Sequence, residues 1–475
     1  MVKIRFPKPW FSTLVRASTP FSDHCAPVRS VVPEEAGRLG QAEVTDLPLV
    51  LQQLVDGAPV ENEEQRLKLK LILSENREAF SLNGKIGCTD KVLHRIPTGD
   101  AAPIRQKPHR LPLFAKGEAD KCMKEMLDLD IIEPVGDEES EWVSPIVLVR
   151  KKDGSWRFCV DFRSLNRVTK RSSFPLPRID DTLASMYGCS WFTSLDIKSA
   201  YWNIKVAPED RNKTAFVVPG HGIHRFKRMP FGLKNAGASF QFLVEKALPV
   251  AKGGQLNAQN CCLAYLDDII VPGRSVEENL EYVEIVLKAL IKNKLKLHAK
   301  KCVLLARKLE YLGHVISGEG IATSDKKIAK IRDWPRPRCQ KDVRAFLGAA
   351  QYYSNHIQGC ANLAEPLYRL TEKKRSFQWS TAAEESFETL KKALTSPPIL
   401  GYPNPDPTPI EDINPEINKN ESLFVLDCDA SLTAAGAVLS QIQKGQERVI
   451  GYYSHAFSKE PVSYTHLTLP TKRIV

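Results

Sequence analysis

The 475-residue sequence lacks cysteine pairs spaced for a zinc site, and it lacks any apolar run long enough to cross a membrane. Its 11 cysteines are scattered and odd in number, which is typical of reduced thiols rather than of a disulfide framework. The first apolar run is broken by Pro7, Lys8 and Pro9, so it does not resemble a secretory signal. These absences predict an intracellular protein, cytoplasmic or nuclear, that is neither secreted nor bound to a membrane.

The charge balance favours a polyanionic partner without identifying one. Lys and Arg number 67 against 56 Asp and Glu, which gives a formal net charge of +11. The hydrophobic share of 43% is ordinary for a globular protein, and the length suffices for roughly three domains.

The first half of the chain mixes helical and strand-like patterns. We expect residues 1–95 to form a partly ordered leader or linker with one amphipathic helix near 64–80. A further helix is expected at 116–132, before the acidic break GDEESE. Strand-like runs on both sides of Asp153-Gly154 predict a hairpin.

The second half begins with the clearest helix. Apolar residues recur at steps of three and four over residues 275–295, and Ser275 with Glu278 forms a capping-box pattern at its start. Helical patterns continue over 325–400, a segment rich in Pro and Asn follows, and SLFVLDCDAS then suggests another sheet. The mixture favours an α+β fold.

Two adjacent acids, Asp267 and Asp268, interrupt the apolar stretch CCLAYLDDIIV. The apolar residues on either side are typical of short buried strands, so both acids would lie at the bend of a hairpin. Carboxylates brought to one point repel each other unless a cation neutralises them, and a hard cation such as Mg²⁺ suits oxygen ligands. The alternative is an exposed turn, since Asp is a common turn residue.

Asp196 offers a third carboxylate, because it closes the strand-like run at 191–195. The three acids meet only if the two segments are neighbouring strands. Around two Mg²⁺ ions they would serve phosphoryl transfer. The alternative for Asp196 is the N-cap of a helix.

A basic segment precedes Asp196. The stretch VRKKDGSWRFCVDFRSLNRVTKR holds eight cations against only Asp153 and Asp161, which would suit triphosphate or nucleic-acid phosphates. A solvated basic face is the alternative. The cations are Arg150, Lys151, Lys152, Arg157, Arg163, Arg167, Lys170 and Arg171.

Six motifs in order turn these patterns into a resemblance. VRKKDGSWRFCVDFRSLNRVT, PLPRID, SLDIKSAYWNIKV, RMPFGLKNAGASFQ, YLDDIIV and LEYLGHVIS resemble the reverse transcriptase region of the pol polyprotein of gypsy-type LTR retrotransposons. The resemblance runs from about Thr98 to Phe457 and ends in a truncated start of RNase H.

The resemblance implies an α+β right-hand polymerase of fingers, palm and thumb, followed by a connection segment and an incomplete RNase H-like α/β domain. The expected parts are 1–95 leader, 96–273 fingers and palm, 274–320 palm end and primer-grip hairpin, 321–400 thumb and connection helices, 401–421 linker or loop, 422–460 truncated RNase H-like domain, and 461–475 a tail outside the family.

The resemblance also assigns residue roles. Asp196, Asp267 and Asp268 match the catalytic, metal-binding aspartates of the palm. The residues matching the nucleotide-binding positions are Lys151 and Arg157 for the triphosphate, Tyr201 as the steric gate against a ribose 2′-OH, and Phe231 with Gly232 in the pocket. For Tyr201 a plain core aromatic is the alternative. The primer-grip residues are Leu309, Glu310, Tyr311, Leu312, Gly313 and His314.

Near its two ends the sequence departs from the family. Asp429 matches the first RNase H metal ligand, but the sequence follows the family only to about Lys459, and Glu460 is the one acid after it. We therefore expect no RNase H activity. LVDGAPV at 54–60 lacks the Ser or Thr of an aspartic-protease signature, so we expect no protease.

The expected function is that of an RNA-directed DNA polymerase, which would use two Mg²⁺ ions, or Mn²⁺, to add dNTPs to a DNA primer on an RNA or DNA template. The alternative is a non-catalytic nucleic-acid-binding relic. A structural scaffold without a nucleic-acid role would leave the three aspartates and the basic segment unexplained.

Overall fold

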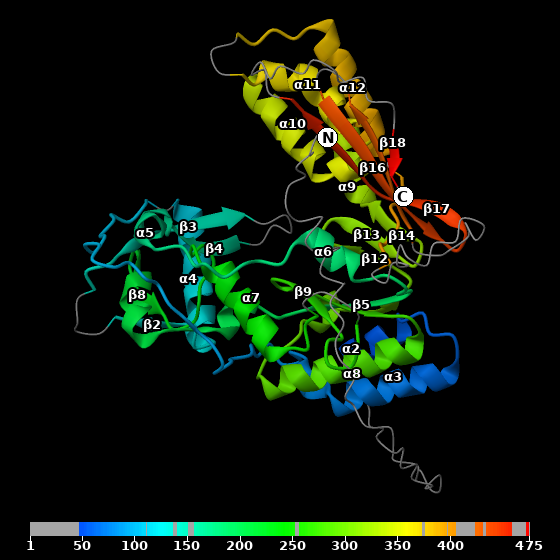
Figure 1. Ribbon diagram of the computed structural model, residues 1–475. Helices are drawn as coiled ribbons and strands as arrows, with labels where there is room; N and C mark the ends of the chain where they lie inside the picture. Colours follow the sequence, from blue (N-terminus) through cyan, green and yellow to red (C-terminus); the bar gives the residue numbers. More distant parts are fainter. Residues whose placement is uncertain are drawn as a thin grey trace, which may run out of the picture. The chain divides into compact units, whose positions relative to one another are not determined.

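The computed structural model describes residues 47–110, 112–135, 140–150, 156–251, 256–372, 376–396, 398–404, 423–430, 434–457 and 472–474 (Figure 1). The chain divides into two units, Met1–Thr45 and Asp46–Val475, and every described residue belongs to the second. Within that described part, no helix is both long and apolar enough to cross a membrane.

A four-stranded sheet in the order β11-β5-β10-β9 forms the centre of the palm. Its strands pair antiparallel throughout. Residues Ile269, Ile270 and Val271 are fully buried, because helices cover the sheet. The strands are β5 (Trp191–Asp196), β9 (Leu263–Tyr265), β10 (Asp268–Gly273) and β11 (Val303–Ala306), and the neighbouring helices are α7 (Ala236–Ala247) and α8 (Val276–Lys292).

Helix α8 is the helix expected at 275–295. The Ser275 side chain accepts a hydrogen bond from the Glu278 backbone N–H, and the Glu278 carboxylate accepts one from the Arg274 backbone N–H. The capping prediction is therefore confirmed, except that Glu278 reaches the backbone of residue 274 rather than that of the cap.

Asn279 fastens α8 to the sheet. Its buried amide donates to the carbonyls of Val271 (2.8 Å) and Trp191 (3.3 Å), and its oxygen accepts from Thr193 Oγ1 at 2.7 Å. Gly273 makes this approach sterically feasible, because a Cβ there would lie 2.8 Å from the Asn279 backbone nitrogen. One side chain thus ties the helix to both β5 and β10.

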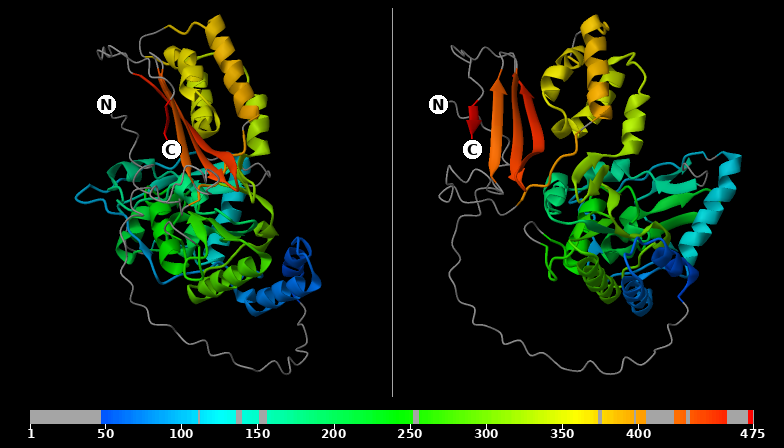
Figure 2. Two further views of the ribbon diagram at one scale, coloured as in Figure 1. Left: turned by 45° about the vertical axis from the view of Figure 1, so that its right-hand side comes forward. Right: turned by 90° about the vertical axis from the view of Figure 1, so that its right-hand side faces the viewer.

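The residues from 47 to 95 belong to the palm core, whereas the sequence suggested a leader. Leu69, Ile72 and Leu73 of α3 are buried, and Gln65 Nε2 donates to Glu277 Oε1 of α8 at 2.7 Å. Helices α3 and α8 lie side by side in Figures 1 and 2. The elements of this segment are α2 (Leu49–Asp56), α3 (Glu63–Glu75), η1 (Arg77–Ala79) and β1 (Leu93–His94), the last pairing parallel with β6 (Lys205–Val206).

The fingers contain a five-stranded sheet in the order β2-β8-β7-β3-β4. Strands β3 and β4 pair antiparallel with Arg150 opposite Trp156, as the hairpin prediction required, while the Asp153-Gly154 turn itself lies outside the described residues. The strands are β2 (Ile132–Pro134), β3 (Ser144–Arg150), β4 (Trp156–Val160), β7 (Phe216–Val218) and β8 (Gly222–Phe226), and the helices of the same stretch of sequence are α4 (Leu113–Asp128), α5 (Arg163–Val168) and η3 (Pro208–Thr214). Two further short helices contact palm elements instead: α6 (Ile179–Ala184) contacts β9, and η2 (Ala200–Asn203) contacts α7.

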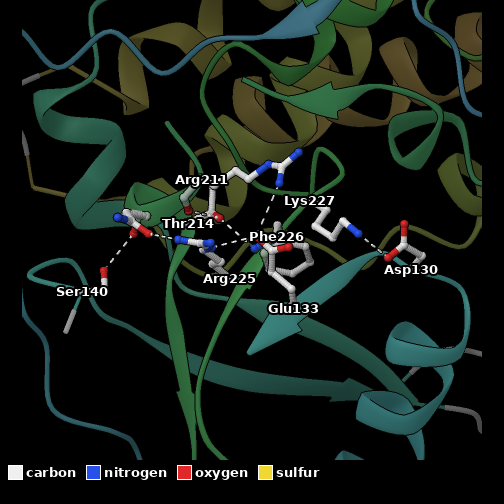
Figure 3. Close-up of polar contacts among 9 residues, drawn as sticks. Asp130, Glu133, Ser140, Arg211, Thr214, Arg225, Phe226 and Lys227 are labelled. Atoms are coloured by element: carbon white, nitrogen blue, oxygen red, sulfur yellow. Dashed lines mark hydrogen bonds and ion pairs between the residues drawn. The ribbon is translucent and has the colours of Figure 1, made fainter. Parts of the chain in front are cut away.

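A polar network joins this sheet to η3 (Figure 3). Arg225 Nε donates to Glu133 Oε1 at 2.8 Å, which links β8 to β2, and Arg225 Nη1 donates to Asn212 Oδ1 at 2.6 Å. Thr214 Oγ1 accepts from the Phe226 backbone N–H at 2.9 Å. Because these groups are largely shielded from water, their bonds fix η3 on the sheet.

Beyond the palm the chain forms a small antiparallel sheet and then a helical thumb. The sheet has the order β12-β13-β14, and the thumb has its own core around Phe346, Phe387 and Leu390. The elements are η4 (Ala299–Lys301), β12 (Lys308–Tyr311), β13 (His314–Ser317), β14 (Gly320–Thr323), α9 (Asp325–Arg332), α10 (Gln340–Tyr352), η5 (Ser354–His356), α11 (Cys360–Leu370) and α12 (Thr381–Thr395).

The C-terminal part is an antiparallel sheet in the order β17-β16-β15-β18. Its last strand lies within residues 461–475, which were expected to be a tail outside the family: Lys472 pairs with Cys428, and Ile474 pairs with Leu426. The strands are β15 (Phe424–Ala430), β16 (Ala434–Gln443), β17 (Gln446–Ala456) and β18 (Lys472–Ile474). Most of the expected linker at 401–421 lies outside the described residues.

Replacing Asn279 with Ala should destabilise the palm. The change removes three buried hydrogen bonds and leaves carbonyls of both central strands unpaired, so we expect the free energy of unfolding to fall by about 2–4 kcal/mol. Urea unfolding of the full chain measures it. Lys288→Ala on the exposed face of the same helix is the control, and equal midpoints for the two variants would contradict the assigned role.

Candidate active site

The register of the palm sheet brings two of the three predicted aspartates together. Asp268, the first residue of β10, pairs with Asp196, the last residue of β5. Residues directly opposite each other in an antiparallel pair have Cβ atoms about 5 Å apart and point to the same face. The two acids, 72 positions apart in sequence, are therefore neighbours at one edge of the sheet.

Asp267 lies on the turn that joins β9 to β10. Tyr265 pairs with Asp268, so Leu266 and Asp267 form a two-residue connection. Leu266 has a φ of +55°, which is a strained backbone conformation for a branched side chain. The predicted hairpin is confirmed, with Asp267 at its bend, whereas Asp268 is the first residue of the following strand rather than part of the bend.

Three carboxylates and the Lys301 ammonium group interact electrostatically at this edge. Asp268 is exposed at the end of its strand, yet the surrounding protein removes enough water to raise the pKa of its carboxyl group. The charges of Asp267 and Asp196 raise this pKa further, while Lys301 opposes them. The site therefore has an excess of negative charge that a cation would relieve.

Lys301 already supplies one positive charge. Its Nζ lies 3.1 Å from Asp196 Oδ2 and 3.3 Å from Oδ1. Our interpretation of the sequence missed this residue, because Lys301 reaches Asp196 only through the pairing of β11 with β5. A basic pair, Lys300-Lys301, just before a strand-like run was the available signal.

The donor chemistry fits a hard divalent cation. Three carboxylates supply only oxygen ligands, which suit Mg²⁺ or Mn²⁺. Across the described residues, no three His, Cys, Asp or Glu side chains are already arranged as a metal cage. The Asp196 carboxylate is paired with the Lys301 ammonium group.

Tyr201 and Phe231 lie beside the aspartates. Their ring centroids are 5.1 Å apart, and Tyr201 also packs against the buried ring of Phe240 at 5.8 Å. Burial raises the pKa of Tyr201, and the charge of Asp267 raises it further. Phe231 is 42% exposed, so the pair presents an aromatic surface toward solvent near Asp267.

The turn after Phe231 needs its glycine. Gly232 has a φ of +90°, a conformation that side chains strain. Asn166, which the sequence reasoning did not single out, holds this turn: its Nδ2 donates to the Gly232 carbonyl and its Oδ1 accepts from the Lys234 N–H, both at 2.8 Å.

Neither predicted triphosphate cation has a described side chain. Lys151 lies outside the described residues. Arg157 lies on β4 opposite Val149, and only its backbone is described. Their roles stay predictions.

The predicted primer-grip residues form the β12–β13 hairpin. Tyr311 and His314 are buried and pair with each other across the turn formed by Leu312 and Gly313, while Leu309 is half-buried. Burial raises the pKa of Tyr311 and lowers that of His314 to about 4. Glu310 accepts from Ser324 Oγ at 2.6 Å and from Lys326 Nζ at 3.1 Å, and these bonds lower the pKa of its carboxyl group.

Asp429 lies far along the chain, in the C-terminal sheet. It is exposed on β15 and opposes Gly436 of β16. Its role as a remnant RNase H metal ligand stays a prediction.

Comparison with known families now defines the class of protein. Residues 149–316 match the family described as reverse transcriptase (RNA-dependent DNA polymerase), and residues 416–470 match the RNase H-like domain found in reverse transcriptase. The chain therefore contains a reverse transcriptase domain followed by an RNase H-like region. It is homologous to the Pol polyproteins of gypsy-type LTR retrotransposons, as the motifs predicted.

Individual relatives give the extent of the similarity. The sequence is 34% identical over 385 residues to the retrovirus-related Pol polyprotein from transposon opus of Drosophila melanogaster, covering 78% of this chain and 36% of the polyprotein. It is 33% identical over 322 residues to the Transposon Tf2-3 polyprotein of Schizosaccharomyces pombe, covering 68% of this chain and 22% of that protein. The chain thus spans a minor part of these relatives.

Solved structures confirm the fold. A foamy viral protease-reverse transcriptase in complex with dsDNA matches with a TM-score of 0.73 and 23% identity over 87% of this chain and 82% of that one. The same viral enzyme in complex with an RNA/DNA hybrid matches with a TM-score of 0.70 and 22% identity over 86% of this chain and 52% of that one. The expected α+β polymerase fold is confirmed.

One boundary needs correction. The RNase H-like match extends to residue 470, beyond Lys459 where we expected the family pattern to end. Strand β18, at Lys472–Ile474, pairs with β15 shortly after that match. The sequence motifs placed the end of the RNase H-like region too early, because the last part of this region contains few distinctive residues.

Asp268→Asn should stabilise the chain at pH 7 in the absence of divalent metal. A raised carboxyl pKa means that ionisation costs stability as the pH rises above the ordinary value of 3.8, and the cost is fully present at neutral pH. Asn removes the charge, so we expect a higher melting temperature by scanning calorimetry.

Asp90→Asn is the matched control with the opposite sign. Lys294 and Lys205 lower the pKa of Asp90 to about 2, so its negative charge stabilises the fold at any pH above 3.8, the ordinary pKa of an aspartate. Because Asp90 and its two lysine partners are exposed, Asp90→Asn should lower the melting temperature only slightly. A decrease for Asp268→Asn as well would contradict the repulsion described above.

Proposed function

We propose that the chain is an RNA-directed DNA polymerase, which extends the 3′-OH of a DNA primer with dNTPs on an RNA or DNA template. The observation that carries the proposal is the pairing of Asp196 with Asp268, with Asp267 on the adjoining turn, inside a reverse transcriptase domain. The net charge of +11 agrees with polyanionic partners.

The three aspartates would hold two Mg²⁺ ions, for which Mn²⁺ is an acceptable substitute. When bound, such ions would supply activation of the primer hydroxyl and stabilisation of the leaving pyrophosphate. The protein itself supplies the strand pair that positions Asp196 and Asp268, and the Lys301 ammonium group that pairs with Asp196.

The incoming dNTP would lie against the fingers and palm. Lys151 and Arg157 are proposed to bind its triphosphate, for which a planar guanidinium is well suited. Tyr201 would exclude a ribose 2′-OH, since its half-buried ring is held between Phe231 and Phe240 near Asp267. Phe231 and Gly232 would line the same pocket.

The nucleic-acid partners are proposed to be an RNA template and a primer–template duplex. The structurally similar foamy viral enzyme has been solved with an RNA/DNA hybrid and with dsDNA, which supports this assignment. The β12–β13 hairpin, Leu309 to His314, would contact the primer terminus. We expect the protein to act inside the cell.

For the RNase H-like region we infer that the 475-residue chain does not cleave RNA. Asp429 is the matching ligand, and the acids that follow it are Glu447 and Glu460. Glu447 opposes Ile442 across the β16–β17 hairpin rather than Asp429. A two-metal hydrolase needs several converging carboxylates.

Primer extension with the wild type and Asp267→Asn tests the polymerase proposal. On a heteropolymeric RNA template with all four dNTPs and Mg²⁺, the wild type should extend the primer, and the variant should lose roughly a hundredfold or more of the rate. Duplex binding, measured by fluorescence anisotropy, should stay within about twofold because one carboxylate is changed outside the basic segment.

Two outcomes would contradict the proposal. Normal extension by Asp267→Asn would show that the site is wrongly assigned. Duplex binding without any extension by the wild type would favour the non-catalytic relic. A label on the RNA strand of the same hybrid reports cleavage, and shortened RNA would overturn the inference about RNase H.

Tyr201→Ala should weaken sugar discrimination. Removing the ring opens the space where a 2′-OH would lie, so incorporation of ribonucleotides relative to deoxyribonucleotides should rise by about tenfold or more. Single-nucleotide incorporation with dNTP and rNTP pairs measures the ratio. Tyr201→Phe, which keeps the ring, is the control, and an unchanged ratio in Tyr201→Ala would exclude the gate.

A further inference from the structure

The turn of the β12–β13 hairpin has a strained backbone. Tyr311 pairs with His314, so Leu312 and Gly313 are its two central residues. Their φ angles are +48° and +77°, and positive values at both central positions are those of a type I′ hairpin turn. Glycine accepts this conformation readily, but leucine does so at a cost. The leucine turn therefore needs support from elsewhere.

Two consecutive tyrosines at the end of thumb helix α10 supply that support. Tyr352 Oη donates to the Leu312 carbonyl at 2.6 Å, and Tyr353 Oη donates to the Gly313 carbonyl at 2.9 Å. A Cβ at position 313 would lie in ordinary contact with both hydroxyl oxygens, 3.6 Å from each, so the positive φ rather than a lack of space favours glycine there. Both central carbonyls of the turn are thus held by the thumb.

Aromatic packing fixes the tyrosines in this position. The His314 ring stacks on Tyr352 with centroids 5.5 Å apart and meets Tyr353 edge-on at 5.5 Å. On its other side it stacks on His356 of η5 at 5.6 Å. Tyr353 and His314 are buried, whereas Tyr352 is 46% exposed and covers the cluster from the solvent side.

The same hairpin also contacts the catalytic strand. Tyr311 is buried, and its hydroxyl donates a long hydrogen bond of 3.4 Å to the backbone carbonyl of Asp268. The hairpin is therefore fastened on one side to the strand that carries an active-site aspartate and on the other side to the thumb.

We propose that Tyr352 and Tyr353 are positioning residues that hold the primer-grip turn in register with the Asp268 strand. The hydroxyls lock the Leu312-Gly313 turn, and the turn sets where a primer 3′ end lies relative to the aspartates. A thumb displaced from the palm would release the turn, so nucleotide addition depends on the thumb being seated. The effect on nucleotide addition rests on the proposed polymerase function, whereas the locking of the turn follows from the contacts alone.

The double variant Tyr352→Phe/Tyr353→Phe tests the inference, because it removes both hydroxyls and keeps both rings. Tyr368→Phe is the matched control: this thumb tyrosine also donates to α10, at Gln351 Oε1 (3.3 Å), but does not contact the turn. The first measurement is hydrogen exchange of the peptide covering residues 308–317 in the free full chain. The second is the single-turnover extension rate together with the Kd for a primer–template duplex.

Exchange in the 308–317 peptide should become about tenfold faster in the double variant and stay unchanged in the control. The extension rate should fall by about tenfold, with the duplex Kd within about twofold of the wild type. Restoring Tyr353 alone should recover part of both effects.

Equal exchange in the double variant and the wild type would overturn the locking of the turn, whether or not the chain polymerises. Faster exchange with an unchanged extension rate would overturn the positioning role. A parallel loss of extension, duplex binding and thermal stability would also overturn it, by showing a general structural role. If the wild type itself does not extend a primer, the proposed function fails, and the exchange measurement still decides on the turn.

Discussion

The antiparallel pairing of β5 with β10 is the constraint on which the rest of the structure depends. It sets Asp196 opposite Asp268 and places like charges side by side at the edge of a sheet that is otherwise apolar. Neighbouring like charges are expected to cost stability, in agreement with the raised pKa of Asp268, and packing on the far side of the sheet offsets that cost. Asn279 ties both strands to α8, and α3 packs against that helix in turn.

Other side chains around this pair stabilise separate parts of the site. Lys301 offsets the charge of Asp196 without supplying a ligand. Asn166 holds the turn beside Phe231, and Tyr352 with Tyr353 holds the turn of the β12–β13 hairpin. In each of the two turns, backbone groups of residues with positive φ accept hydrogen bonds from side chains distant in sequence. Strained turns near the aspartates are thus fixed by side chains rather than by local sequence preference.

Much of the palm and of the fingers hairpin could be predicted because the signals are local. The capped helix α8, the β3–β4 pairing and the hairpin carrying Asp267 and Asp268 follow from spacing and turn residues within short windows. What could not be predicted are contacts across long separations. The sequence does not show that Lys301 reaches Asp196, or that α10 reaches residue 312, because neither contact leaves a periodic pattern. Residues 47–95 looked like a leader for the same reason: an amphipathic helix does not reveal what covers its apolar face.

Asp196, Asp267 and Asp268 are proposed to form one divalent-metal site, and Mn²⁺ binding tests this proposal most directly. Electron paramagnetic resonance of the full chain with primer–template duplex and dideoxy-terminated primer counts bound Mn²⁺ without any turnover. Saturable binding by the wild type that is lost in Asp196→Asn and in Asp268→Asn is the predicted result. Equal Mn²⁺ binding by the wild type and both variants would contradict the account.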